Sequence, residues 1–161
     1  RSFGATVTEA PNGMTVEMAG DIHPIDVTTG PFPEFATDHQ AIVMAVAALA
    51  KGESRIRETI YEGRFGHVAE LCRMGANIQL SGQVAKVVGV EKLQGATVEV
   101  RDLRAGAALI LAGLTATGRT VLEEGHHLRR GYEQFEQKLR SLGAHITDAQ
   151  EEDDDLRLLG C

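Results

Sequence analysis

Two long apolar stretches predict the main helices of this chain. Residues 41–50 are continuously apolar, and residues 107–116 form a second stretch of the same kind. Around them we expect helices over Asp38–Ala50 and Arg104–Thr115. Apolar residues three or four positions apart predict two shorter helices, Gly66–Met74 and Gly131–Leu142.

Short runs that alternate apolar and polar residues lie between these helices and predict strands. The predicted strands are Ser54–Glu58, Asn77–Leu80, Val84–Val88, Thr97–Arg101 and Thr120–Glu124. The order strand, helix, strand, helix and then two strands is typical of a mixed α/β architecture.

This order occurs more than once, because the chain matches itself at an offset of 66 residues. The two apolar stretches coincide at that offset. Other matched residues are Gly52 with Gly118, Glu58 with Glu124, and Arg64 with Arg130. A Gly-Ala step occurs three times before a short alternating stretch, at residues 4–5, 75–76 and 143–144. The sequence therefore predicts repeated β-α-β-α-β-β units.

The predicted units are not whole at either end. We expect one partial domain over residues 1–149, with units near 4–28, 29–95 and 96–149, and an acidic, solvated tail over 150–161. The first residue is Arg1, and nothing near it resembles a signal peptide. We therefore expect the natural protein to include upstream sequence.

Charge and cysteine content exclude several classes of protein. The 161-residue chain has a net charge of −7, and this acidic balance argues against a nucleic-acid partner. No apolar run approaches the ~18 residues of a membrane-spanning helix. The two cysteines, Cys72 and Cys161, make neither a disulfide framework nor a zinc site, and a cytoplasmic location fits them. Cys72 lies in an apolar helical pattern and is expected in the core.

Three arginines are candidates for an anion pocket. Arg64 and Arg130 occupy the same place in their units, before the second helix, and Arg104 opens a first helix. Helix N-termini favour anions, and a guanidinium matches carboxylate or phosphate. Alternatively, each arginine pairs with an acid nearby in the sequence. The residues alone leave both readings open.

Two acidic residues lie at predicted helix starts. Thr37 and Gln40 have the spacing of a capping box, which leaves Asp38 in the first turn, where its pKa should be lowered. Asp102 is expected to cap the helix that Arg104 opens.

The pair His126-His127 is expected on a strand, where adjacent side chains point to opposite faces. No metal site is therefore predicted there or elsewhere in the sequence.

Six motifs, in this order and spacing, together resemble the UDP-N-acetylglucosamine enolpyruvyl transferases over about Asp26 to Ile146. They are Thr37-Asp38-His39-Gln40, Glu62-Gly63-Arg64-Phe65, Met74-Gly75-Ala76, Gly89-Val90-Glu91-Lys92-Leu93, Asp102-Leu103-Arg104-Ala105 and Arg130-Gly131-Tyr132-Glu133. The chain is similar, more distantly, to the shikimate-pathway enolpyruvyl transferases.

The resemblance implies a fold and a reaction. The fold is an inside-out α/β barrel domain built from β-α-β-α-β-β units and incomplete in this chain. The reaction transfers the enolpyruvyl group from phosphoenolpyruvate to the 3-hydroxyl of UDP-N-acetylglucosamine and releases phosphate, in the first committed step of peptidoglycan synthesis. It implies no cofactor, no nucleic acid and no membrane. The missing N-terminal part of the same enzyme is an implied partner.

The resemblance also implies roles for particular residues. Asp38 matches the aspartate that takes the sugar hydroxyl proton, and Arg130 matches an arginine that holds phosphoenolpyruvate. The further substrate-binding positions implied are Thr37, Ile60, Arg64, Asp102 and Arg104. The resemblance favours the arginine pocket over local pairing.

Some features of the family are missing or changed. Its acid cysteine lies on another domain, and neither cysteine here matches it. Phe32, Gly63 and Arg129 stand where histidine, asparagine and aspartate are common. Two alternatives to a transferase fragment therefore remain: a non-catalytic module that binds a UDP-sugar or anion, and an interaction protein that acts through its acidic tail.

Overall fold

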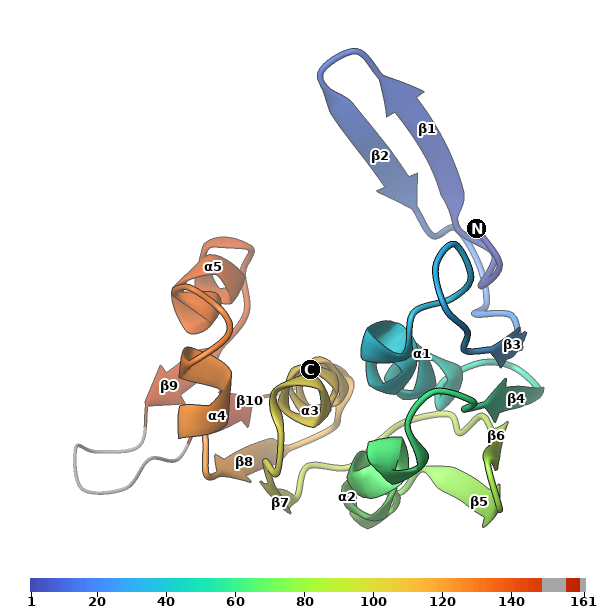
Figure 1. Cartoon of the computed structure of the whole chain (residues 1–161). Helices are drawn as coiled ribbons and strands as arrows, with labels where there is room; N and C mark the ends of the chain where they lie inside the picture. The colour runs from blue at the N-terminus through green and yellow to red at the C-terminus, as the bar shows by residue number, and fades with distance from the viewer. Residues whose placement is uncertain (149–155, 160–161) are drawn as a thin grey trace.

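The computed structural model describes residues 1–148 and 156–159, which form two four-stranded sheets, a separate hairpin and several helices (Figure 1). The acidic run at 151–155 lies outside the described residues. The hairpin consists of β1 (Thr6–Ala10) and β2 (Gly13–Glu17). The first full unit contains β3 (Asp26–Thr28), η1 (Thr37–His39), α1 (Gln40–Ala47), β4 (Glu53–Arg57), η2 (Glu62–His67), α2 (Val68–Arg73), β5 (Asn77–Ser81) and β6 (Val84–Val88). The second contains β7 (Thr97–Glu99), α3 (Leu103–Thr115), β8 (Arg119–Glu123), α4 (His126–Arg129), α5 (Phe135–Ser141), β9 (Ile146–Asp148) and β10 (Leu156–Leu159).

The two four-stranded sheets have the same topology, which confirms the predicted repeat. Their strand orders are β3-β4-β6-β5 and β7-β8-β10-β9. In each sheet the first pair is parallel and the other two pairs are antiparallel. The chain is thus mixed α/β, and its second unit ends in the same arrangement of strands as its first.

The last strand corrects one expectation. The sequence predicts a solvated tail over residues 150–161, but Leu156–Leu159 is β10, which lies between β8 and β9. Leu158 is fully buried. A strand placed between two others buries its apolar side chains, and this outweighs the polarity of the acidic residues that precede it.

The Gly-Ala steps mark where the chain leaves one element and enters an antiparallel strand pair. Gly75 and Gly143 have φ of +90° and +96° and follow α2 and α5. After each glycine the alanine N–H donates back into the helix, from Ala76 to Leu71 O and from Ala144 to Leu139 O, both at 3.0 Å. This left-handed helix ending favours glycine, which explains why the step recurs.

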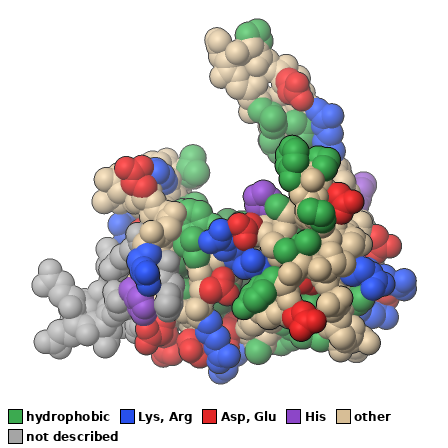
Figure 2. Space-filling model, viewed as in Figure 1, with side chains coloured by type: hydrophobic (Ala, Val, Ile, Leu, Met, Phe, Trp, Pro, Cys, Tyr) green, Lys and Arg blue, Asp and Glu red, His purple; other side chains and the backbone are tan. Residues whose placement is uncertain are grey.

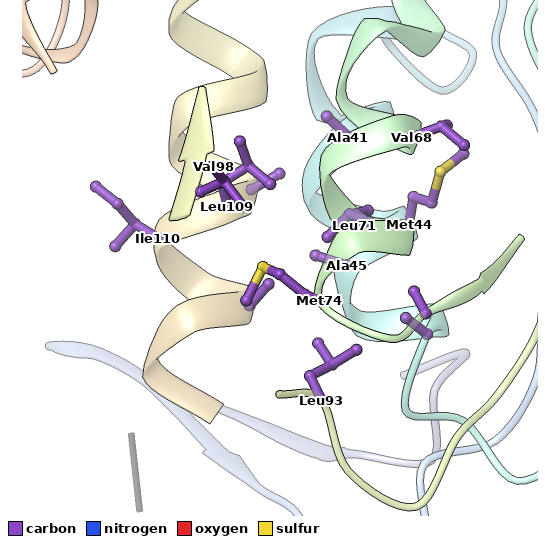
Figure 3. Close-up of a cluster of buried hydrophobic side chains, with 14 of the residues drawn as sticks. Ala41, Met44, Ala45, Val68, Leu71, Met74, Leu93, Val98, Leu109 and Ile110 are labelled. Carbon is purple, nitrogen blue, oxygen red and sulfur yellow. The ribbon is translucent and has the colours of Figure 1, made fainter. Parts of the chain in front are cut away.

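The core lies between α1, α2 and α3. Figure 3 shows Leu71 and Met44 on one side, Leu109 on the other, and Met74 between them. All four side chains are fully buried. Helices α1 and α3 pack against each other, and this contact brings their N-terminal ends together.

Three local predictions are wrong. His126 and His127 begin helix α4 instead of lying on a strand, because Leu128 is fully buried and its side chain packs at Gly106 of α3. The helix predicted over Gly131–Leu142 begins only at Phe135, after Gln134 with φ of +49°. Cys72 is exposed, because the buried face of α2 is formed by other residues.

The β1–β2 hairpin stands away from the rest of the chain (Figure 1). Met14 and Val16 are 63% and 62% exposed, so the hairpin carries apolar side chains on its surface. No helix within residues 1–148 and 156–159 has the length and apolar character that crossing a bilayer requires.

Candidate functional site

The candidate site is centred on Asp38, which bridges two arginines from distant parts of the sequence. Arg64 Nη2 donates to Asp38 Oδ1 at 3.3 Å, and Arg104 Nη2 donates to Asp38 Oδ2 at 2.7 Å. Asp38 lies on η1 at the start of α1, Arg64 on η2, and Arg104 in the first turn of α3. Figure 2 shows basic and acidic side chains gathered in the hollow between the hairpin and the helices of the second unit.

Two of the three candidate arginines are brought together by this geometry. Arg64 and Arg104 do converge, and each pairs with an acid, but the acid is 26 and 66 residues away in the sequence. The pairing is therefore tertiary, and it depends on α1 lying beside α3.

The site keeps Asp38 ionised. The pKa of Asp38 is lowered from its ordinary 3.8, chiefly by the hydrogen bond from Arg104, with the charges of Arg104 and Arg64 adding to the effect and partial burial opposing it. The same hydrogen bond raises the pKa of Arg104. Asp38 remains 48% exposed, so a ligand can reach its carboxylate.

The predicted capping box at Thr37 and Gln40 is wrong. Thr37 is the first residue of η1, whose N-cap is Ala36, and no side-chain cap hydrogen bond is formed there. The Thr37 hydroxyl instead donates to Glu58 Oε2 at 2.9 Å and accepts from Arg64 Nε at 3.1 Å. Gln40 is fully buried, and its amide nitrogen and oxygen have no partner among the described residues.

Glu58 is the residue of this region that the sequence reasoning missed. It is fully buried at the end of β4, and its carboxylate accepts from Thr29, Thr37 and the backbone of Ile60 and Tyr61. The strand alternates between exposed residues at 53, 55 and 57 and buried residues at 54, 56 and 58. An acidic residue on the buried side of that alternation is the signal that could have revealed it.

Ile60 is half exposed on the loop after β4, close to this network. Its N–H is already used by Glu58 Oε1 at 2.8 Å. The Ile60 backbone N–H is therefore part of the hydrogen-bond network around Glu58.

Asp102 is the N-cap of α3. Its Oδ1 accepts from the N–H groups of Arg104 and Ala105 at 2.8 and 3.0 Å. The predicted capping role is therefore confirmed, and it fixes the backbone of Arg104.

Arg130 does not join the Asp38 cluster. It is exposed between α4 and α5 and lines a cavity of about 330 Å³ with Arg101, Asp102, Leu103 and Gly131. No ion pair joins it to any of residues 1–148 or 156–159. This cavity lies at the same end of α3 from which Arg104 reaches Asp38.

His67 adds no positive charge to this site near neutral pH. Burial lowers its pKa from 6.5 to about 4, and the side chain is 2% exposed. In the described part of the chain, no group of three or more His, Cys, Asp or Glu is arranged to hold a metal ion.

Comparison with known proteins relates the chain to enolpyruvyl transferases. The family model described as "EPSP synthase (3-phosphoshikimate 1-carboxyvinyltransferase)" matches residues 1–139. The UDP-N-acetylglucosamine 1-carboxyvinyltransferase of Chelativorans sp. (strain BNC1) is 54% identical over 144 residues, which are 89% of this chain and 34% of that protein. The protein of the same name from Anaeromyxobacter dehalogenans (strain 2CP-C) is 52% identical over 146 residues, or 91% and 35%.

Solved structures agree with the sequence comparisons. The enolpyruvyl transferase NikO from Streptomyces tendae superposes with a TM-score of 0.82 at 32% identity, over 89% of this chain and 34% of that one. The EPSP synthase from Acinetobacter baumannii superposes with a TM-score of 0.70 at 19% identity, over 99% and 37%, which is a likeness of fold. The chain spans about a third of the length of the curated relatives it matches.

Proposed function

The chain belongs to the EPSP synthase family, as a homologue of UDP-N-acetylglucosamine 1-carboxyvinyltransferases, and from this we propose that it supplies one side of an enolpyruvyl transferase site. The substrates are phosphoenolpyruvate and UDP-N-acetylglucosamine, and the products are the 3-O-enolpyruvyl sugar and phosphate. Peptidoglycan synthesis in the cytoplasm is the corresponding process. The rest of the site, including the acid that protonates phosphoenolpyruvate, comes from sequence beyond these 161 residues. The complete domain is the inside-out α/β barrel.

The observation that carries the proposal is Asp38 held between Arg64 and Arg104. An ionised, half-exposed carboxylate can accept the proton of a sugar hydroxyl within hydrogen-bond reach. The contact with Arg64 is the longer of the two, so the hydroxyl takes its place at Oδ1 while Arg104 keeps Oδ2. Losing one guanidinium contact raises the pKa of Asp38 and makes it a better base.

The proposed reaction is an addition followed by an elimination. The 3-hydroxyl loses its proton to Asp38, and its oxygen forms a bond to C2 of phosphoenolpyruvate while C3 takes a proton from the other side of the site. The tetrahedral adduct then loses a proton from C3 to a base on the other side of the site. The electron pair of that C–H bond forms the C2–C3 double bond while the bond between C2 and the phosphate oxygen breaks and phosphate leaves. Arg130 and Arg104 stabilise the phosphate and carboxylate charges through these steps.

The first test measures phosphate release by the full-length gene product that contains this chain, supplied with both substrates. We expect one phosphate per sugar converted, and a loss of about a hundredfold or more in kcat on Asp38→Ala. Asp21→Ala is the matched control, because Asp21 pairs with Lys51 on the surface. Unchanged turnover in the Asp38 variant would remove Asp38 as the base.

A binding module is the second candidate, because this chain by itself forms the Asp38–Arg64–Arg104 cluster. The Asp38–Arg64–Arg104 cluster would then hold a UDP-sugar without turnover. Calorimetry of the 161-residue chain with UDP-N-acetylglucosamine tests this: heat of binding that Arg64→Ala abolishes supports the module, and no heat excludes it.

A further inference from the structure

Glu58 joins three separate segments through one buried carboxylate. Its Oε1 accepts from the Thr29 hydroxyl at 2.8 Å and from the N–H groups of Ile60 and Tyr61 at 2.8 and 3.0 Å. Its Oε2 accepts from the Thr37 hydroxyl at 2.9 Å. A buried charge is costly unless it is fully hydrogen-bonded, and this one accepts four hydrogen bonds.

The first arm of this network ends at Arg64. The Thr37 hydroxyl has one proton, which it donates to Glu58, so its lone pair is left to accept from Arg64 Nε. The neighbouring Nη2 of the same guanidinium reaches Asp38. Because a carboxylate only accepts, Glu58 fixes the direction of this chain of hydrogen bonds.

The second arm also ends at Arg64. Glu58 holds the Tyr61 N–H, and the Tyr61 ring lies under the Arg64 guanidinium, 5.1 Å from ring centroid to Cζ. The Tyr61 carbonyl accepts from the backbone N–H of Arg64 at 3.0 Å. Arg64 is therefore held by the hydroxyl, the ring and the backbone of two residues that Glu58 itself holds.

The equivalent residue of the next unit shows that this network is not a general part of the repeat. Glu124 matches Glu58 at the 66-residue offset, but its side chain is 59% exposed and lies near His126. Glu58 instead binds Thr29 and Thr37, at the two ends of the loop that precedes η1.

We propose that Glu58 is a positioning residue of the transferase, which holds Arg64 in place while the substrate hydroxyl replaces it at Asp38. The inference rests on the proposed function. Burial by itself would raise the pKa of the Glu58 carboxyl, but the hydrogen bonds from Ile60, Tyr61, Thr29 and Thr37 outweigh burial and leave the pKa lowered, so the group is ionised near neutral pH.

The test compares Glu58→Gln, Thr37→Val and the double variant in the full-length gene product. Each single variant should lower kcat/KM for UDP-N-acetylglucosamine about tenfold to a hundredfold, the range expected for one charge-assisted hydrogen bond. The KM for phosphoenolpyruvate should change less than threefold. The double variant should lose no more than the worse single variant, because both act through one chain of contacts.

Two further variants separate positioning from mere structural support. Thr37→Ser keeps the hydroxyl and should recover most of what Thr37→Val loses. Glu53→Gln, the same substitution on the exposed side of β4, should leave the kinetics unchanged. Losses that multiply in the double variant, or that follow only the unfolded fraction, would overturn the inference.

A readout without turnover keeps the inference distinct from the proposed function. The Arg64 Nε–H resonance should be protected from solvent exchange in the wild type and in Thr37→Ser, and should exchange at least tenfold faster in Glu58→Gln and Thr37→Val. If the wild type transfers no enolpyruvyl group, the proposed function fails, and this exchange still decides whether Glu58 positions Arg64. Equal exchange in all variants would contradict it.

Discussion

Asp38 and Arg104 occupy equivalent positions in two successive repeat units, 66 residues apart, and their side chains meet at 2.7 Å. Both lie at the N-terminal end of the first helix of their unit. Packing α1 against α3 thus brings two copies of one sequence position into contact. In this site one copy carries an acidic side chain, Asp38, and the other a basic side chain, Arg104.

Arg104→Ala should raise the pKa of Asp38 towards its ordinary value of 3.8. The hydrogen bond from Arg104 is the largest cause of the lowered pKa, and the charge of Arg104 adds to it, so the loss of this side chain should reduce the shift. Carboxyl carbon NMR of Asp38 across the acid range measures this. Arg101→Ala, which breaks a surface pair with Glu99, should leave the titration where it is. If the pKa of Asp38 stays low in Arg104→Ala, Arg64 and not Arg104 is the main cause of the lowered pKa.

Asp102→Ala should lower the free energy of unfolding by about 1 kcal/mol, the usual value of a lost helix cap. Asp102→Asn keeps an oxygen that can accept from the Arg104 and Ala105 N–H groups, so it should unfold near the wild type. Denaturant titration compares the two. If Asp102→Asn is stable but slow in turnover, its charge acts in the reaction. If both variants are stable, the cap contributes little.

Acid should destabilise the chain through His67. Its folded pKa of about 4 lies below the unfolded 6.5, so the unfolded state binds the proton first as pH falls. The contribution of His67 to the free energy of unfolding is therefore fully present above about pH 6.5. It is lost progressively between pH 6.5 and 4, and the whole pKa shift corresponds to about 3 kcal/mol. His67→Leu should flatten this part of the curve of unfolding free energy against pH. An equally steep curve in the variant would assign the loss to other groups.

Gly75→Ala should cost about 1 kcal/mol of stability, because alanine resists the φ of +90° at that position. No atom lies within 4 Å of the added methyl group, so the cost is conformational. Gly66→Ala is the matched control: it too meets nothing within 4 Å, and its φ is not left-handed. Thermal unfolding of both variants provides the measurement, and equal melting temperatures would refute the conformational account.

The sequence predicted the elements whose signal is local. The alternating strand over residues 84–88 and the apolar stretch at 107–116 are a strand and a helix in the structure. The repeat was visible because matching residues recur at one offset. Asp102 was recognised as a cap because the residue type and its place before a helix suffice for that role.

The errors arise where distant contacts decide. Thr37 has the spacing of a helix cap, but its hydroxyl instead donates a hydrogen bond to a buried carboxylate 21 residues away. Leu158 follows an acidic run, but it is buried because its strand, β10, lies between β8 and β9. Sequence spacing cannot supply either fact, because both depend on which segments the fold places side by side. Glu58 was noticed only as a repeat match, since its partners come from three segments.

The contact between equivalent positions has an evolutionary consequence. Two identical units would set Asp against Asp, or Arg against Arg, where α1 meets α3, and like charges in contact repel. A protein formed by copying one unit could therefore not have had this pair at first. The charges had to diverge between copies before the helices could share an ion pair, so the chemistry of this site is carried by what the repeats no longer have in common.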